Sequence, residues 1–248
     1  MLIDDICDLL LSSAANQSVA DVRVGLGYTA VQLDDDRCGL AYTFRDDIQG
    51  GCCVITAAGS LAGRPAPDLA GWARSVDPIA SAIGLATLNA LVPVPPSAVE
   101  TGLLTLLELA PDDVVGMVGY FGPLIEPLRT RCRALHVFER RPSVEPGVLP
   151  ESAAAGILPQ CRIVILSATA LLNRTLDGLL AWCRNAREVA ILGPSTPLLP
   201  QFFAGRGVTL LSGVQVVDGE RVLRLVSEGG GTRQLGSAVR KLTVRCGA

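Results

Sequence analysis

The sequence predicts an α/β protein of two domains, a small α+β domain at residues 1–94 followed by a doubly wound parallel-sheet domain at residues 95–248. Apolar runs alternate with helical patterns in the second part, as in βαβ units. A glycine-rich turn joins the first of these runs to a helix. Prolines at positions 93, 95 and 96 form a stiff connector between the two parts. Apolar residues make up 49% of the chain, enough for a core in each domain.

Residues 113–139 organise the second domain. They read as a buried strand at 114–118, a glycine turn at 119–123, a helix, and a second strand that ends at Glu139. Glu139 lies about twenty residues beyond the turn, where such domains place an acid that binds a ribose or similar polyol. The turn has the pattern G-x-x-G-P, which differs from the dinucleotide pattern G-x-G-x-x-G. The stretch therefore predicts a small-molecule crevice without indicating a particular nucleotide.

Further strands are expected at residues 135–139, 162–167, 188–193 and 208–217, with helices between most of them. Ligands of parallel sheets bind at the carboxyl ends of the strands. Four loops follow these ends, at residues 119–123, 139–142, 167–173 and 193–197. Asn173 is expected to cap a helix at 174–183, and Ser195 or Thr196 to cap one that starts at Pro197. Such helix starts bind anions, or they are ordinary caps.

In the first part of the chain, the sequence predicts a helix at residues 2–14, a hairpin of strands 21–33 and 38–44, and a third strand at 52–57. Helices are expected at 66–74 and, capped by Asp77, up to residue 91. Asn89 is the large polar residue near the end of this apolar helix. Its side chain is expected either to be hydrogen-bonded in the core or to face a cleft. After the prolines, Ser97 and Glu100 have the spacing of a capping box for a new helix.

The composition limits the kind of partner and location. A net charge of −3 argues against nucleic-acid binding, and no apolar run is long enough to span a bilayer. The first residues carry acids where a signal peptide has basic residues, so a cytoplasmic location is expected. The eight cysteines include no C-x-x-C. Cys52 and Cys53 are expected on opposite faces of a strand, and the single histidine, His136, in mid-strand. We therefore expect no metal site made of side chains, and the sequence indicates no cofactor.

Several stretches resemble one known family. GMVGYFGPLIEPL, HVFERRP, VILSATALLNRTLDGLL and AILGPSTPLLPQFFAGRGV, together with VGLGYTAVQL and AIGLATLNAL, resemble motifs of the "Putative heavy-metal chelation" family. This resemblance implies an enolase-N-terminal-like domain, a Rossmann-like domain, and a ligand cleft between them. It also implies a role in metal handling or chelator synthesis. The candidate residues carried over by motif are Glu139 as catalytic residue and, for ligand binding, Gly119, Phe121, Thr169, Asn173, Ser195, Thr196, Tyr28, Thr29 and Asn89.

Three functions fit these observations. The first is an enzyme of condensation or hydrolysis that acts on a pterin-, flavin- or siderophore-like metabolite, with Glu139 as general base or polyol anchor. The second is a non-catalytic protein that binds a metal–chelator complex. The third is a protein similar to S-adenosylmethionine-dependent methyltransferases, although Tyr120, Phe121 and Pro123 leave little room for a nucleotide. The expected partner is a small molecule, and a homodimer is one of the assembly states left open.

Overall fold

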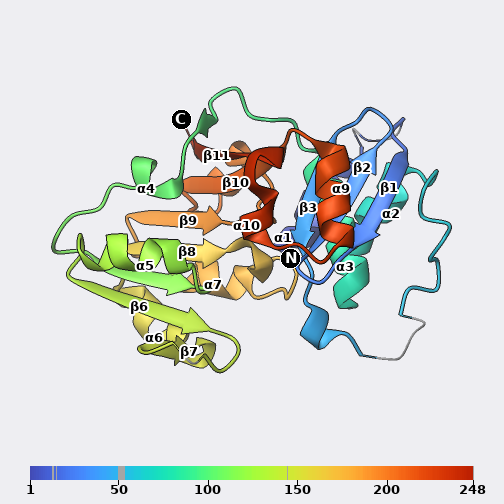
Figure 1. The fold of residues 1–248 in the computed structure, drawn as a ribbon. Coiled ribbons are helices and arrows are strands. Elements are labelled where there is room, and N and C mark those ends of the chain that lie inside the picture. Colours follow the sequence, from blue (N-terminus) through green and yellow to red (C-terminus); the bar gives the residue numbers. More distant parts are fainter. Residues whose placement is uncertain (13, 15, 50–53, 144, 248) are drawn as a thin grey trace.

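A computed structural model describes residues 1–12, 14, 16–49, 54–143 and 145–247. Two separate β-sheets form the framework (Figure 1). One has three strands in the order β1-β2-β3, and the other has eight in the order β4-β11-β10-β9-β8-β5-β6-β7. The α/β class expected from the sequence is confirmed, with a mostly parallel large sheet and a small antiparallel one.

The large sheet contains the strands that the sequence predicts around the glycine turn. β5 (Val114–Val118), β6 (Ala134–Glu139), β8 (Ile163–Ser167) and β9 (Glu188–Leu192) run parallel, as do β7 (Val148–Pro150) and the first part of β10 (Leu210–Val216) beside β9. β11 (Val239–Arg245) runs antiparallel to β10, and the short β4 (Val99–Glu100) adds to β11. β4, β7 and β11 were not among the strands expected from the sequence.

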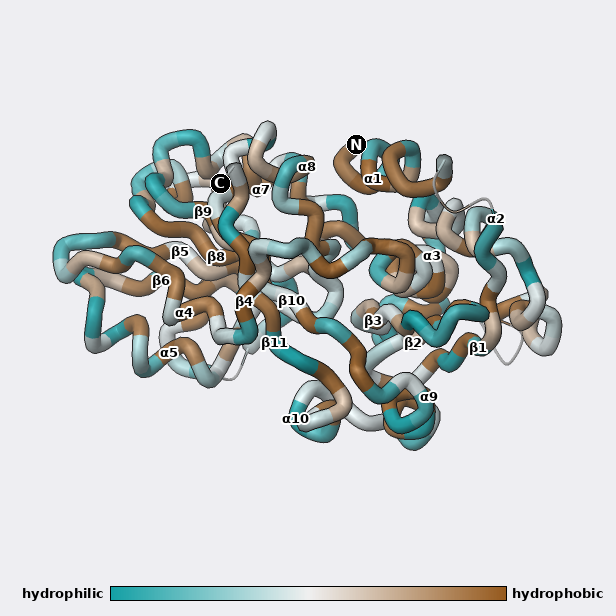
Figure 2. Tube along the Cα trace, turned by 90° about the horizontal axis from the view of Figure 1, so that it is seen from above, coloured by the Kyte–Doolittle hydropathy of each residue, from teal (hydrophilic) through white to brown (hydrophobic). Residues whose placement is uncertain are grey.

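Helices cover both faces of this sheet. In β8, Val164 and Leu166 point to one face and pack in a cluster with α7 (Leu176–Trp182) and α6 (Ala154–Ile157). Ile163 and Ile165 point to the other face, towards α4 (Leu103–Leu106) and α5 (Gly122–Arg129). Because successive side chains of a strand alternate between faces, the continuous apolar run of β8 is buried on both. The inner strands β8 and β9 are accordingly largely brown in Figure 2.

The small sheet consists of β1 (Val19–Val24), β2 (Tyr28–Leu33) and β3 (Cys38–Tyr42). One of its faces is covered by α3 (Pro78–Leu91), with α1 (Leu2–Leu11) and α2 (Ala66–Ala70) packed beyond. Asp77 caps α3, as predicted, by accepting hydrogen bonds from the N–H groups of Ile79 and Ala80. Helix and strand approach closely, since a Cβ added at Gly39 would lie 2.1 Å from the backbone oxygen of Ala86.

The other face of the small sheet is covered by the C-terminal part of the chain. α9 (Gly219–Ser227) packs on β1 and β2, and residues from α9 and from α10 (Thr232–Leu235) form a cluster with Tyr28, Ala30 and Leu40. A Cβ added at Gly25 would lie 2.1 Å from the backbone oxygen of Val226. The division at residues 94 and 95 stays a prediction, and the structure adds that the first part shares a core with residues 222–238.

Several expected element boundaries are wrong. The strand expected at 21–33 is two strands, because the chain turns at residues 25–27, where the Gly25 N–H bonds to the Tyr28 oxygen. Ser97 caps no helix, since Val99 and Glu100 pair with β11 instead. Residues 54–57 form no strand, and positions 52 and 53 lie outside the described residues.

The two helices expected after loops 167–173 and 193–197 also begin later than predicted. α7 starts at Leu176, because Arg174 has a left-handed φ of 61° that no α-helix can include. α8 (Pro200–Ala204) starts at Pro200 instead of Pro197. The residues expected as helix caps, Asn173, Ser195 and Thr196, therefore lie in loops before these helices.

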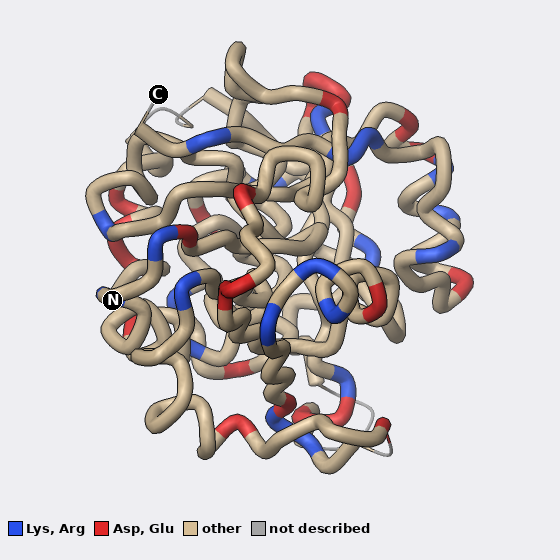
Figure 3. Tube along the Cα trace, turned by 90° about the vertical axis from the view of Figure 1, so that its left-hand side faces the viewer, with Lys and Arg blue, Asp and Glu red and all other residues tan. Residues whose placement is uncertain are grey.

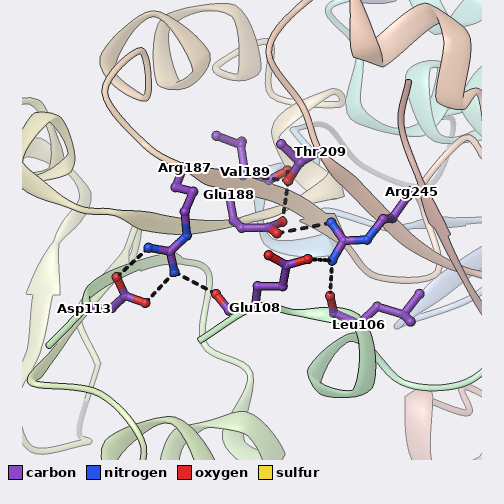
Figure 4. Close-up of polar contacts among 8 residues, drawn as sticks. All are labelled: Leu106, Glu108, Asp113, Arg187, Glu188, Val189, Thr209 and Arg245. Carbon is purple, nitrogen blue, oxygen red and sulfur yellow. Dashed lines mark hydrogen bonds and ion pairs between the residues drawn. The ribbon is translucent and has the colours of Figure 1, made fainter. Parts of the chain in front are cut away.

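At the amino ends of the parallel strands, two arginines bind buried carboxylates (Figure 4). Arg187 donates to Asp113 at 2.7 and 3.2 Å, and Arg245 donates to Glu188 at 3.2 Å. Burial opposes ionisation of Asp113, but hydrogen bonds from Arg187 and from the Ala110 N–H outweigh it, so the pKa of this carboxyl lies below its usual value. These contacts tie β9, β10 and β11 to the chain segment before β5.

Charges of both signs are interspersed along the chain (Figure 3). This distribution shows no stripe of one sign in that view, where a nucleic-acid footprint would concentrate lysine and arginine. Among the described residues, no helix is both long and apolar enough to cross a bilayer.

Candidate functional site

A cavity of about 350 Å³ lies at the carboxyl ends of the parallel strands, where the small sheet faces the large one. The β5, β6, β8 and β9 strand ends contribute its floor, and β2, β3 and the loop after β3 contribute its wall. All four loops expected from the sequence reach it. This is the position at which open parallel sheets bind their ligands.

The turn after β5 is built for close packing. Gly119 has a φ of 97°, which glycine adopts without strain, and its N–H donates to the Phe138 oxygen at 2.9 Å. A Cβ at this position would lie 2.9 Å from the Cβ of Ser167 on the neighbouring strand. The glycine therefore allows the ends of β5 and β8 to approach, and it turns the next N–H, that of Tyr120, towards β6.

Glu139 ends β6 and lines the cavity beside this turn, as expected. Its Oε1 accepts a hydrogen bond of 2.6 Å from the Tyr120 N–H. Its arginine neighbours bind elsewhere. Arg140 and Arg141 pair with Asp47 at 2.5 and 2.6 Å, and no ion pair joins Glu139 to any described residue. The carboxylate is thus oriented by the backbone, and its second oxygen has no bond to a described protein group.

A second carboxylate, which the sequence analysis missed, lies beside Glu139. Glu151 lines the cavity and directly follows Pro150, the Cα partner of Glu139 across β6 and β7. Burial, and then the nearby charge of Glu139, raise the pKa of Glu151 against the opposing effect of Arg140. A raised pKa favours the protonated form of Glu151, which can donate a hydrogen bond or a proton. No sequence pattern marked this residue, because β7 was not predicted.

The wall that faces these carboxylates is aromatic. Tyr28 and Tyr42 lie 6.1 Å apart with nearly perpendicular rings, and Tyr42 and Phe44 lie 5.1 Å apart. The hydroxyl of Tyr28 hydrogen-bonds to that of Thr232 at 2.7 Å, and burial raises the pKa of Tyr28. Arg140 stacks 4.8 Å from the ring centre of Phe44. Such a surface suits a flat, partly polar ligand.

The remaining wall carries hydroxyl and amide groups. The hydroxyls of Ser167 and Thr169 hydrogen-bond to each other at 2.8 Å. The Oδ1 of Asn173 accepts from the N–H and the hydroxyl of Thr175. The Oγ of Ser195, buried at 2% exposure, accepts from the Tyr42 N–H at 2.8 Å and so joins the two sheets.

The structure brings seven of the ten candidate residues to this cavity, namely Glu139, Gly119, Phe121, Thr169, Asn173, Ser195 and Tyr28. Thr29 is fully buried and shares a hydrogen bond with Thr43 in the small sheet. Thr196 and Asn89 line a second cavity on the other side of the loop at residues 193–196. Residues that the sequence analysis did not select but that line the first cavity include Tyr42, Phe44, Asp46, Arg141, Glu151 and Thr232.

Among the described residues that line the cavity, none supplies the thiolate or imidazole ligand that a heavy-metal ion prefers. Soft metal ions prefer thiolate and imidazole, and the cavity offers carboxylates, hydroxyls and aromatic rings. In the described part of the chain, no group of three or more His, Cys, Asp or Glu side chains could hold a metal. Burial raises the pKa of Cys7 and Cys161 to about 11, which keeps these thiols protonated. The site therefore fits an organic molecule better than a bare ion.

A cavity at the strand ends of a mostly parallel sheet, bordered by a second small sheet, defines an α/β protein with a candidate ligand site. Two sequence profiles described as "Putative heavy-metal chelation" match residues 7–92 and 102–245. The chain belongs to this family, as the sequence motifs indicated.

Related proteins match the chain over most or nearly all of its length. An uncharacterized protein of Methanocaldococcus jannaschii is 27% identical over 90% of each chain. A crystal structure of a protein of unknown function from Desulfitobacterium hafniense has a TM-score of 0.81 and 26% identity, and covers 98% of both chains. A second, from Pyrococcus horikoshii, has a TM-score of 0.87 and 24% identity, and covers 99% of this chain and all of that one. Both crystal structures are of proteins from the DUF364 family, whose profile matches residues 102–245 of this chain.

Proposed function

We propose that the cavity at the strand ends binds a planar, oxygen-rich metabolite of pterin-, flavin- or siderophore-like chemistry, and that the protein is an enzyme that condenses or hydrolyses it. The product or substrate would serve heavy-metal chelation, as the family description suggests. The metal would then be bound by the small molecule and not by the protein.

The observation that carries the proposal is the pair of carboxylates at the ends of β6 and β7. Glu139 is held by the Tyr120 N–H and would accept a proton from a water or a ligand hydroxyl. Glu151, with its raised pKa, would donate one to the leaving group. An acid with a raised pKa beside a second carboxylate is a common arrangement in hydrolytic sites.

The aromatic wall supports a flat ligand. A pterin or flavin ring would stack against Tyr42 or Phe44, while hydroxyls such as that of Thr169 would meet its carbonyl and amide edges. Arg141 at the rim would attract a carboxylate on the ligand, although its ion pairs with Asp46 and Asp47 reduce this attraction.

Native mass spectrometry of protein purified without added ligand tests the proposal. We expect a co-purified organic molecule, and we expect Glu139→Gln to lower its occupancy at least tenfold, which corresponds to about 1.4 kcal/mol. Glu145→Gln, an exposed position outside the cavity, is the matched control. Fluorescence titrations with pterin-6-carboxylate and with flavin mononucleotide provide a second measurement. Equal binding by Glu139→Gln and the parent would overturn the role of Glu139.

A turnover experiment separates an enzyme from a binding protein. The co-purified molecule, or the titrated pterin or flavin that binds, is incubated with the parent, Glu139→Gln and Glu151→Gln proteins. Conversion by the parent that is lost in both variants supports an enzyme. Tight binding without conversion favours a carrier of a metal–chelator complex, and binding of S-adenosylmethionine instead favours a methyltransferase.

A further inference from the structure

We propose that the slot between the outer edges of β3 and β10 is a second binding site, which takes a small organic molecule with secondary amide groups. The slot is a cavity of about 290 Å³, distinct from the cavity that contains Glu139. The loop at residues 193–196 separates the two, and Pro194 borders both. The proposal does not depend on the function proposed for the first cavity.

The edge of β10 has backbone groups without a strand partner. β10 pairs with β9 only from Leu210 to Ser212. On its other side, β10 pairs with β11. The Cys246 N–H donates to the Thr209 oxygen and the Val217 N–H donates to the Ala238 oxygen, so the backbone groups of the odd-numbered residues of β10 point towards β11. Val214 and Val216 therefore direct their N–H and C=O groups away from β11, into the slot.

The edge of β3 presents the same pattern from the opposite side. Hydrogen bonds at Gly27–Thr43 and Leu33–Arg37 place the odd-numbered residues of β3 in the ladder with β2. The even-numbered residues then face outwards, as two contacts show. The Tyr42 N–H donates to Ser195, and the Leu40 oxygen accepts from Asn89 at 2.8 Å. The N–H of Leu40 and both backbone groups of Cys38 have no bond to a described protein group.

The two edges face each other across the slot. Figures 1 and 2 both place the end of β10 beside β3. At one end the slot is filled by the loop at 193–196, where Ser195 binds Tyr42 and Thr196 binds the Ser212 oxygen at 3.1 Å. At the other end a Cβ added at Gly219 would lie 3.5 Å from the Cβ of Cys38. Between these ends no strand separates β3 from β10.

The slot is also lined by Asn89, whose side-chain oxygen lacks a hydrogen-bond donor among the described groups. Asn89 uses its Nδ2 to hold Leu40, and its buried Oδ1 has no hydrogen-bond partner among the described groups. Apolar side chains also line the slot, including Val92 and Val94 from the connector and Leu198 from the loop. A buried acceptor without a partner costs about 1–3 kcal/mol, so a ligand N–H would be favoured there.

These features select the ligand chemistry. Strand edges offer N–H donors and C=O acceptors in alternation, which match the N–H and C=O of secondary amides. The volume is at the lower limit for ligand pockets and the slot is closed at both ends, so a molecule of dipeptide size fits and a strand of a partner protein does not.

Nuclear magnetic resonance of the full-length ¹⁵N-labelled protein tests the proposal with N-acetylalanine N-methylamide, which has two secondary amides. We expect saturable shifts of the Leu40, Val214 and Val216 amide resonances. N-acetylproline dimethylamide, which has carbonyls but no N–H, should bind at least tenfold more weakly. The absence of saturable shifts at these amides, or equal shifts with both compounds, would overturn the proposal.

A variant tests the location. Val94 lines the slot and is 41% exposed, so Val94→Trp can occupy the slot without disturbing a core. We expect at least tenfold weaker binding of the probe by this variant. Val99→Trp, at a position of similar exposure outside the slot, should bind like the parent. Unchanged binding by Val94→Trp would place the probe elsewhere and contradict the assignment. If the variant does not fold, the comparison of the two compounds on the parent protein still tests the proposal.

Discussion

The backbone N–H of Tyr120 donates a 2.6 Å hydrogen bond to the carboxylate of Glu139, nineteen residues further along the chain. The bond connects the turn after β5 with the end of β6, so the position of the carboxylate depends on two neighbouring strands and not on a salt bridge. One oxygen is held, and the other has no hydrogen bond to a described protein group.

Glu139→Gln should leave stability nearly unchanged. Its amide oxygen can still accept from Tyr120, and a substitution at a half-exposed position without an ion pair changes the free energy of unfolding by about 0.5 kcal/mol or less. Urea denaturation followed by circular dichroism measures this. A loss above about 2 kcal/mol would make Glu139 a structural residue, and any loss of ligand would then follow from misfolding.

The buried carboxylate of Glu188 should matter more than the exposed one of Glu108, although both bind Arg245. Glu188 is 3% exposed and also accepts from Thr209 at 2.7 Å, whereas the Glu108 side chain is 70% exposed. We expect Glu188→Ala to cost about 2–4 kcal/mol and Glu108→Ala less than about 1 kcal/mol. Equal losses in denaturant titrations would show that burial does not decide the strength of these pairs.

Two helical glycines should respond in opposite directions to alanine. A Cβ at Gly84 in α3 would lie 1.9 Å from the backbone nitrogen of Ala73, so Gly84→Ala should destabilise by about 1–3 kcal/mol or more. Gly178 in α7 has open space around it, so Gly178→Ala should stabilise by about 0.5–1 kcal/mol. Thermal unfolding compares the pair, and a stable Gly84→Ala variant would contradict the close packing of α3 on residues 72 and 73.

The buried thiols should make the protein less stable at alkaline pH. Burial raises the pKa of Cys38 and Cys183 to about 12, against about 8.5 in an unfolded chain. Because the unfolded state loses its thiol protons first, this contribution to stability is complete below pH of about 8.5 and declines as the pH rises towards the folded pKa. Urea denaturation from pH 7 to pH 10, with Cys183→Ala as the comparison, measures the slope. A slope that is the same in this variant would exclude Cys183.

Residues 1–94 should not fold on their own without α9. One face of its sheet is buried by Val222, Leu223 and Val226 of α9. A fragment of residues 1–94 exposes this face, and we expect it to aggregate unless residues 219–238 are supplied as a peptide. A stable, monomeric fragment, shown by its circular dichroism and sedimentation, would support the domain division at residue 94 as a division of folding units.

The local sequence determined much of the large sheet. The strands β5, β8 and β9 are buried on both faces, so each appears in the sequence as a continuous apolar run. Each run is short and is followed by a turn, and these two features identified it as a buried strand. The glycine turn and Glu139 followed from the same pattern, because the end of a parallel strand points to the ligand edge. The cap at Asp77 was also local, since it needs only the next two N–H groups.

Tertiary structure decided what lies beside these elements. Glu151 reaches the cavity because β7 pairs with β6, and a three-residue strand leaves no periodic signal. Ser195 does not cap a helix as expected. Its hydroxyl oxygen instead accepts a hydrogen bond from the N–H of Tyr42, 153 residues away. Asn89 and Thr196 came to a second cavity because two sheets meet there. Contacts between residues far apart in sequence depend on how layers pack, and no local pattern of residues encodes that packing.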